Sequence, residues 1–150
     1  MALSAIVVPV RPVPVKSVSV YKSKSFARFQ KRAKLTDRDL WMAVQAAENG
    51  LIDADLGGGV IKQRIARAGQ GKSGGSRSIV LFRKGNRAVY VYGFEKKDRP
   101  NIRPEEVEAF KELAAVVLGY TDAEMFDRVN DGALIAVAGP GEESDGKKIS

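Results

Sequence analysis

Neither histidine nor cysteine occurs among the 150 residues of the chain. Without cysteine the chain can form no disulfide and no thiolate metal site. Without histidine it cannot perform Ser-His-Asp or Cys-His catalysis, and it cannot bind zinc through imidazole. Acid–base chemistry therefore falls to Lys, Arg, Tyr, Asp or Glu. We expect no metal ion and no other cofactor.

Long hydrophobic runs are also lacking, so we expect no membrane partner and a cytoplasmic location. The apolar start alternates valine with proline, which prevents a helix, and it lacks the basic start and continuous apolar stretch of a signal peptide. We interpret residues 1–15 as a disordered N-terminal extension. The polar, glycine-rich residues 139–150 are interpreted as a disordered tail, which leaves one domain over residues 16–138.

Positive charge is concentrated in one part of the chain, whose overall net charge is +7. Residues 60–99 carry eleven basic and two acidic side chains, for a net charge of +9, whereas residues 100–150 have a net charge of −6. Such a concentration indicates a polyanionic partner. The alternative is an ordinary solvated surface, and charge density alone does not decide between them.

The pattern of apolar residues predicts an α+β fold. We expect an N-terminal strand, a helical hairpin, a three-stranded antiparallel meander that completes a four-stranded curved sheet, and a C-terminal helix. The predicted elements are a strand over residues 16–22, helices over 25–35 and from Thr36 to Asn49, a loop over 53–59, strands over 60–66, 76–83 and 87–94, helices that begin near Pro104 and Thr121, and a short apolar segment, interpreted as an edge strand, at 134–138.

The predicted meander carries the candidate functional residues. Alternation places Lys62 and Arg64 on one face, and it gives Tyr90 and Tyr92 a common face with Phe94 beyond them. Cations beside aromatic rings suit single-stranded RNA, because phosphates pair with the cations while bases stack on the rings. The alternative is that the aromatic residues pack under the helices. The candidate RNA-contacting residues are Arg64, Arg67, Arg83, Tyr92, Phe94 and Lys96.

This residue set can support cleavage of RNA without a metal. The 2′-hydroxyl of RNA can attack its own adjacent phosphodiester, so the protein must position the chain, move two protons and neutralise charge on phosphorus. Arginine suits the last task because its guanidinium binds phosphoryl oxygens bidentately. A lysine crowded by other cations has its charged form disfavoured and can act as a base.

Three segments resemble one branch of the RelE/ParE toxin superfamily. They are residues 53–64 (DADLGGGVIKQR), residues 67–77 (RAGQGKSGGSR) and residues 92–102 (YGFEKKDRPNI). The glycine run in the first segment either lets the backbone approach another chain or a phosphate, or forms a flexible turn. The resemblance covers residues 18–138 and implies a toxin that is a ribosome-dependent endoribonuclease, held inactive by a cognate antitoxin. Some superfamily members poison DNA gyrase instead.

The resemblance also implies roles for individual residues. Arg77 matches the arginine that stabilises the scissile phosphate, and Lys97 and Arg99 match basic residues for leaving-group protonation and phosphate contact. The general base falls among Lys62, Arg64 and Lys72, so the implied catalytic residues are Arg77, Lys97, Arg99, Lys62 and Lys72. Two positions depart from RelE itself: Ser76 replaces an aromatic residue, and Arg103 replaces a catalytic tyrosine.

The expected partners are a cognate antitoxin, messenger RNA on the ribosome, and operator DNA bound by the toxin–antitoxin complex. An acidic or amphipathic antitoxin helix could dock on Phe26, Phe29 or the C-terminal helix. Two alternatives to the ribonuclease stay open. One is a gyrase inhibitor of the same fold, and the other is a non-catalytic, autoregulatory nucleic-acid-binding module.

Overall fold

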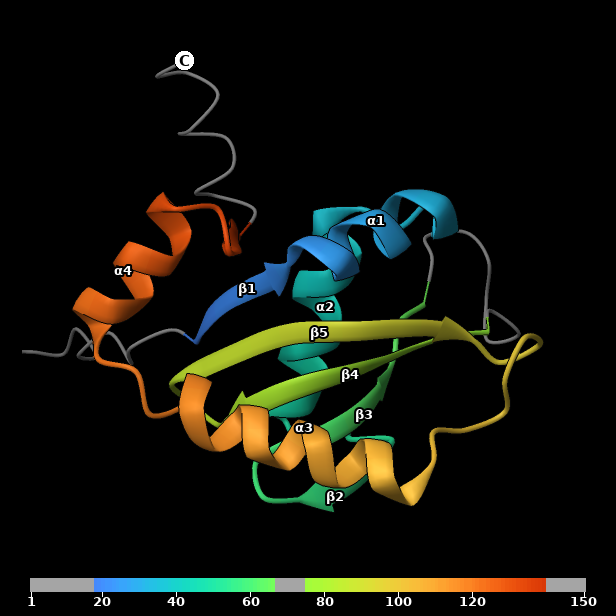
Figure 1. Ribbon diagram of the computed structural model, residues 1–150. Coiled ribbons are helices and arrows are strands. Elements are labelled where there is room, and N and C mark those ends of the chain that lie inside the picture. Colours follow the sequence, from blue (N-terminus) through green and yellow to red (C-terminus); the bar gives the residue numbers. More distant parts are fainter. Residues whose placement is uncertain (1–17, 67–74, 140–150) are drawn as a thin grey trace, which may run out of the picture.

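A computed structural model describes residues 18–66 and 75–139, and it shows an α+β fold in which helices pack on both faces of one sheet (Figure 1). In chain order the elements are β1 (Ser19–Ser23), α1 (Lys24–Ala33), α2 (Asp37–Glu48), β2 (Ala54–Gly57), β3 (Val60–Arg64), β4 (Ser76–Arg83), β5 (Arg87–Glu95), α3 (Pro104–Val117), α4 (Asp122–Asn130) and β6 (Leu134–Val137). The predicted disordered segments fall outside the described residues, apart from Gly139. Within the described ranges, no helix is both long and apolar enough to cross a membrane.

The sheet has six strands in the order β2-β3-β4-β5-β1-β6, whereas the sequence predicts four. The expected antiparallel meander of β3, β4 and β5 is confirmed, and β1 joins it by pairing in parallel with β5. The prediction of a loop over residues 53–59 is wrong, because Ala54 and Asp55 pair with Lys62 and Ile61 to form β2. The short apolar segment forms the edge strand β6 against β1.

The helix starts follow the capping rules that the sequence predicts. The Asp39 amide donates to Thr36 Oγ1 at 3.0 Å, and the Thr36 amide donates to Asp39 Oδ2 at 2.8 Å. Thr121 and Glu124 form the same reciprocal pair at the start of α4. These bonds satisfy amides that have no partner within the helix, so each helix begins where its capping residue stands.

Each face of the sheet has its own hydrophobic core. We call the side covered by α1 and α2 the hairpin face and the other side the α3 face (Figure 1). Along β4, Val80 belongs to the hairpin core, while Ile79 and Leu81 belong to the α3 core. Strand β4 is therefore covered on both faces, which accounts for its continuous apolar run from Ile79 to Phe82.

The two phenylalanines suggested as an antitoxin docking surface lie inside the hairpin core. Phe26 is 1% exposed and Phe29 is 7% exposed, and their ring centroids are 5.6 Å apart. That expectation is wrong for these residues, because they fill the space between α1 and the sheet.

A β-bulge in β5 reverses the facing of its side chains. Tyr90 lies opposite Val80 and Tyr92 lies opposite Ile79, so Val91 is an extra residue on β5. As a result Tyr90 packs in the hairpin core, whereas Tyr92 packs with Phe94 on the α3 face. The prediction that Tyr90 and Tyr92 share a face is wrong, because simple alternation does not survive an inserted residue.

The glycine run 57–59 forms the tight turn from β2 into β3. All three glycines have positive φ, from 61° to 88°. A Cβ at Gly59 would come within 2.8 Å of Leu118 Cδ1, and one at Gly58 within 3.0 Å of Lys111 Cγ. Glycine is therefore required both for the backbone conformation and for close packing on α3 and the residue that ends it. The glycines therefore let the backbone of this turn pack closely on α3 and Leu118 of the same chain.

Candidate active site

Three cationic side chains are brought together where β3 ends and β4 begins. Arg64 on β3 lies opposite Arg77 on β4, and Lys62 precedes Arg64 by two residues on the same face. We call Lys62, Arg64 and Arg77 the basic cluster. Arg77 in turn lies opposite Phe94 of the α3 core, which places the cluster on the α3 face.

One carboxylate enters this cluster. Asp53 Oδ2 lies 3.4 Å from Arg77 Nε and 3.9 Å from Lys62 Nζ. The Arg77 and Lys62 side chains are 16% and 19% exposed, and the Asp53 side chain is 33% exposed. The two cations are therefore partly covered, and both lie close to the Asp53 carboxylate.

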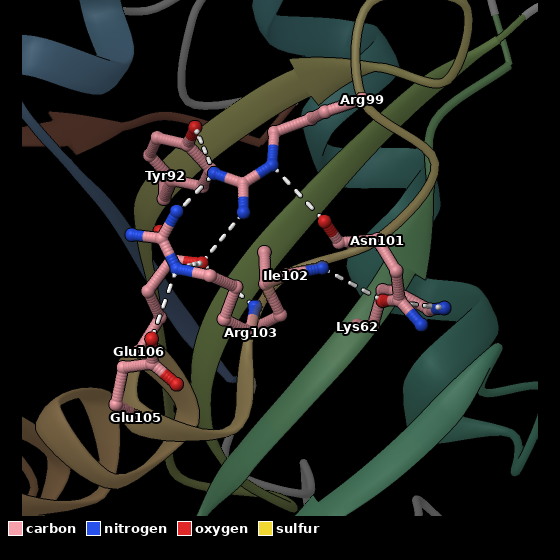
Figure 2. Close-up of polar contacts among 8 residues, drawn as sticks. All are labelled: Lys62, Tyr92, Arg99, Asn101, Ile102, Arg103, Glu105 and Glu106. Carbon is pink, nitrogen blue, oxygen red and sulfur yellow. Dashed lines mark hydrogen bonds and ion pairs between the residues drawn. The ribbon is translucent and has the colours of Figure 1, made fainter.

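A fourth cation, Arg99, is held in place just after β5 (Figure 2). Its guanidinium forms a bidentate pair with Glu106 of α3, with Nη2 donating to Oε1 at 2.6 Å and Nη1 to Oε2 at 3.1 Å. Nη1 also donates to the Tyr92 hydroxyl at 3.0 Å, and Nε donates to the Asn101 carbonyl at 3.0 Å. The guanidinium carbon lies 5.7 Å from the Tyr92 ring centroid and 5.9 Å from that of Phe94.

These contacts fix the charge state of the pair. The hydrogen bonds that Arg99 donates to Glu106, followed by the one to Tyr92, raise the pKa of Arg99 above its ordinary value. The hydrogen bond from Arg99, followed by that from the Arg103 amide, lowers the pKa of Glu106 to about 2. Arg99 therefore stays charged and cannot give up a proton to a leaving group.

Asn101 links Arg99 to the basic cluster (Figure 2). Its side-chain Oδ1 accepts from Lys62 Nζ at 3.5 Å and from the Ile102 amide at 2.9 Å, while its carbonyl accepts from Arg99 Nε. Because Ile102 packs in the α3 core, the segment between β5 and α3 is anchored beside Lys62.

Over residues 18–137 the sequence matches the model of a family described as the RelE toxin of the RelE / RelB toxin-antitoxin system. The chain belongs to the RelE toxin family. Its role is therefore that of the toxin in a toxin–antitoxin pair, and a cognate antitoxin is its partner. No curated protein matches the sequence.

The structure brings most of the predicted RelE site residues to one end of the sheet. Lys62, Arg64 and Arg77 form the basic cluster, and Tyr92 and Arg99 lie on the same face. Lys96 and Lys97 are exposed in the turn after β5, beside the start of β4, because the Lys96 amide donates to the Gly75 carbonyl at 2.7 Å. Arg67 and Lys72 lie outside the described residues.

Two of the predicted RNA-contacting residues do not lie exposed beside the basic cluster. Arg83 is exposed at the far end of β4, opposite Arg87, and six residues of extended strand place it roughly 20 Å from Arg77. Phe94 is 4% exposed, so its ring has no open face for a base. Both placements have a simple cause: strand length separates Arg83 from the cluster, and the α3 core covers Phe94.

The two departures from RelE itself also have a structural setting. Ser76 is fully buried and its hydroxyl donates to Glu95 Oε2 at 2.9 Å, so it fixes the end of β4 against β5. Arg103 is exposed just before α3, and its Nε lies 3.1 Å from Glu105 Oε2. Neither residue reproduces the aromatic group it replaces.

Sequence reasoning missed three residues that organise this RelE site. Asp53 was assigned to a loop, and no pattern distinguished Asn101 from its neighbours. Glu106 falls within the predicted helix that begins near Pro104, and nothing in the sequence analysis assigns it to the site. The sequence does offer a cue for Glu106, which stands three residues after Arg103, the N-cap residue of α3. In the structure its carboxylate accepts a hydrogen bond from the Arg103 amide.

Proposed function

We propose that this toxin is a ribosome-dependent endoribonuclease that cuts messenger RNA and thereby inhibits translation. The observation that supports this most is the direct cross-strand juxtaposition of Arg64 and Arg77, with Lys62 beside them. Like charges directly opposite one another weaken a sheet. A bound polyanion relieves that repulsion, and arginine pairs with phosphate bidentately. The basic cluster thus suits a phosphodiester.

In the proposed reaction the ribose 2′-oxygen forms a bond to the adjacent phosphorus, and the bond from phosphorus to the 5′-oxygen breaks. The products are a 2′,3′-cyclic phosphate and a 5′-hydroxyl. Arg77 stabilises the charge that develops on the non-bridging oxygens. The 2′-hydroxyl proton is accepted by Lys72 or by the neutral amine form of Lys62, and Lys97 protonates the leaving oxygen.

The remaining cations support this chemistry from its edges. Arg64 and Lys96 contact neighbouring phosphates, and Tyr92 borders the site. Arg99 shapes the site through its hydrogen bonds to Tyr92, Glu106 and Asn101, since these contacts occupy its guanidinium. Without a histidine the acid–base groups are poorly matched to neutral pH. Positioning of the message by the ribosome therefore supplies much of the rate.

The test compares Arg77→Ala with Arg83→Ala, which removes the same charge from the other end of β4. Removal of a group that stabilises developing charge costs about 10²–10³-fold in rate. We expect Arg77→Ala to lose cleavage of mRNA on programmed ribosomes by about that factor and to lose toxicity on expression. Arg83→Ala should retain most of both. Circular dichroism checks that both variants fold.

Full toxicity of a folded Arg77→Ala variant would show that the site is wrong. If the wild-type protein cuts no translated message but blocks supercoiling by purified gyrase, the gyrase-inhibitor alternative replaces the ribonuclease. Tight, salt-sensitive RNA binding without a cut product supports a non-catalytic binding module instead.

A further inference from the structure

We propose that Asp53 is a positioning residue of the RNA-cleavage site, whose carboxylate braces Lys62 and Arg77 and stands where a substrate phosphate binds. This inference rests on the proposed ribonuclease function. The geometry that carries it is the placement of one carboxylate oxygen between two cations on adjacent strands, 3.4 Å from Arg77 Nε and 3.9 Å from Lys62 Nζ.

The fold holds Asp53 at this point by a buried amide on the opposite face. The Asp53 backbone amide donates to Gln63 Oε1 at 3.1 Å. Gln63 Nε2 donates in turn to the carbonyls of Ala43 at 3.0 Å and Leu51 at 2.9 Å. Gln63 is only 4% exposed, so the segment that leads into Asp53 is fixed against α2 and β3. The carboxylate is therefore presented to the basic cluster by a rigid support.

A carboxylate here has a clear electrostatic effect on the cations. Lys62, Arg64 and Arg77 crowd one end of the sheet, and their mutual repulsion would drive the long side chains apart into solvent. An ion pair with Asp53 offsets this repulsion and orients the Arg77 guanidinium and the Lys62 ammonium before substrate arrives. Such preorganisation matters because misplacement of a catalytic group by about 1 Å can cost on the order of 10²-fold in rate.

The same carboxylate must give way to the substrate. A charge-assisted N–H to O contact at its strongest spans about 2.7–2.9 Å. The distances of 3.4 Å and 3.9 Å are longer, so Asp53 holds the cations loosely. A phosphodiester offers two non-bridging oxygens to the same donors and can replace the carboxylate. Asp53 therefore competes with substrate for Arg77 and Lys62 while keeping both in place.

This dual role predicts an unusual combination of kinetic effects. Replacing the carboxylate by a neutral amide of the same shape, Asp53→Asn, removes the competing charge, so RNA binds more tightly. It also removes the ion pair that aligns the cations, so turnover slows. A residue that only stabilised the fold would not lower KM and kcat together.

The experiment measures kcat and KM for cleavage of a short synthetic mRNA on programmed ribosomes. It also measures the Kd of the same complexes with a 2′-O-methyl mRNA, which lacks the attacking hydroxyl. The matched control is Asp55→Asn, because Asp55 carries the same charge two residues away and its Oδ1 accepts from the Gly57 amide. Thermal unfolding compares the folding of both variants, and Asp53→Ser serves if Asp53→Asn does not fold.

We expect Asp53→Asn to reduce kcat about tenfold or more and to tighten the Kd roughly threefold. Asp55→Asn should match the wild-type protein in both. In an Arg77→Lys background the loss of kcat from Asp53→Asn should shrink, because the two residues act through one contact.

Three results would overturn this assignment. One is equal behaviour of Asp53→Asn and Asp55→Asn. Another is weaker RNA binding by Asp53→Asn, which would mean that the carboxylate supports binding. The third is loss of kcat at unchanged Kd together with loss of the acidic limb of the pH profile, which would make Asp53 the proton acceptor itself. If the wild-type protein does not cleave mRNA, the proposed function fails, while the Kd comparison still decides whether Asp53 competes with RNA phosphate.

Discussion

Replacing Gly93 by alanine tests how closely α1 packs on the sheet behind the basic cluster. Gly93 lies opposite Ser78 on the hairpin face, and a Cβ there would overlap the Cδ2 and Cε2 atoms of Phe29. Phe29 is 7% exposed and packs on Phe26, whose ring centroid lies 4.8 Å from that of Tyr90. Because the Phe29 ring is buried against its neighbours, we expect α1 to move away from β5 to accommodate the new methyl group.

Overpacking of this kind costs about 1–3 kcal/mol, which for a domain of this size lowers Tm by roughly 4–12 °C. Urea and thermal unfolding measure the change. The control is Gly75→Ala, where a new Cβ would come no closer than 3.6 Å to any neighbour and where stability should stay within about 0.5 kcal/mol of the wild type.

A double-mutant cycle with Phe29→Leu isolates the contact. The leucine removes the overlapping ring, so adding Gly93→Ala to Phe29→Leu should cost much less than it does in the wild-type protein. Independent, additive costs, or a Gly93→Ala variant as stable as Gly75→Ala, would refute the packing explanation.

Two further predictions concern charged side chains around α3. Glu106 has a folded-state pKa of about 2 against an ordinary value of 4.5, so it contributes stability that is complete above pH 4.5 and is lost as the pH falls toward 2. Glu106→Gln should therefore flatten the pH dependence of the urea midpoint in that window, and an unchanged slope would show that the pair contributes nothing. Arg87 is 5% exposed and its Nη1 donates to the carbonyls of Val117 at 2.9 Å and Tyr120 at 3.0 Å. Arg87→Met should cost about 2–4 kcal/mol by leaving these carbonyls unpaired, and it should speed hydrogen exchange in α4, because Arg87 also lies 3.5 Å from Asp122. A loss of stability without faster exchange in α4 would contradict the link between the helices.

Elements whose signal is local could be predicted from the sequence. The capping pair of Thr36 and Asp39 depends on residues three apart, and the apolar run from Ile79 to Phe82 identifies a strand covered on both faces. Strand β2 could not be found in this way. It has four residues that end in glycine, and it exists because its backbone pairs with β3.

The prediction of which sheet face a side chain lies on was wrong where the backbone departs from regular strand geometry. Period-two alternation assigned Tyr90 and Tyr92 to one face, and the extra residue at Val91 reversed that assignment. No composition or spacing rule marks Val91 as a bulge, since valine is ordinary in strands. For Phe94 the sequence offered packing under a helix as an alternative, and the α3 core covers this residue.

The candidate site was predictable as a set of cations but not as a set of contacts. Alternation correctly placed Lys62 and Arg64 together, and the meander brought Arg77 beside them. The partner of Arg77 is Asp53, which reaches it across β3 from the far edge of the sheet. Pairing of this kind depends on side-chain position across strands, which the chain order does not reveal.

The strand order separates β1 and β6, which pair with segments distant in the chain, from β3 and β4, which carry the basic cluster. Val20 pairs with Ala88 on one side and with Val137 on the other, so β1 closes two long chain loops before its hydrogen bonds form. Edge strand β6 has a single neighbour, as β2 has at the opposite edge, and should open more readily than the strands inside the sheet. Strands β5 and β1 lie between β6 and β4. Local opening of β6 can therefore occur while Arg64 and Arg77 stay paired across β3 and β4.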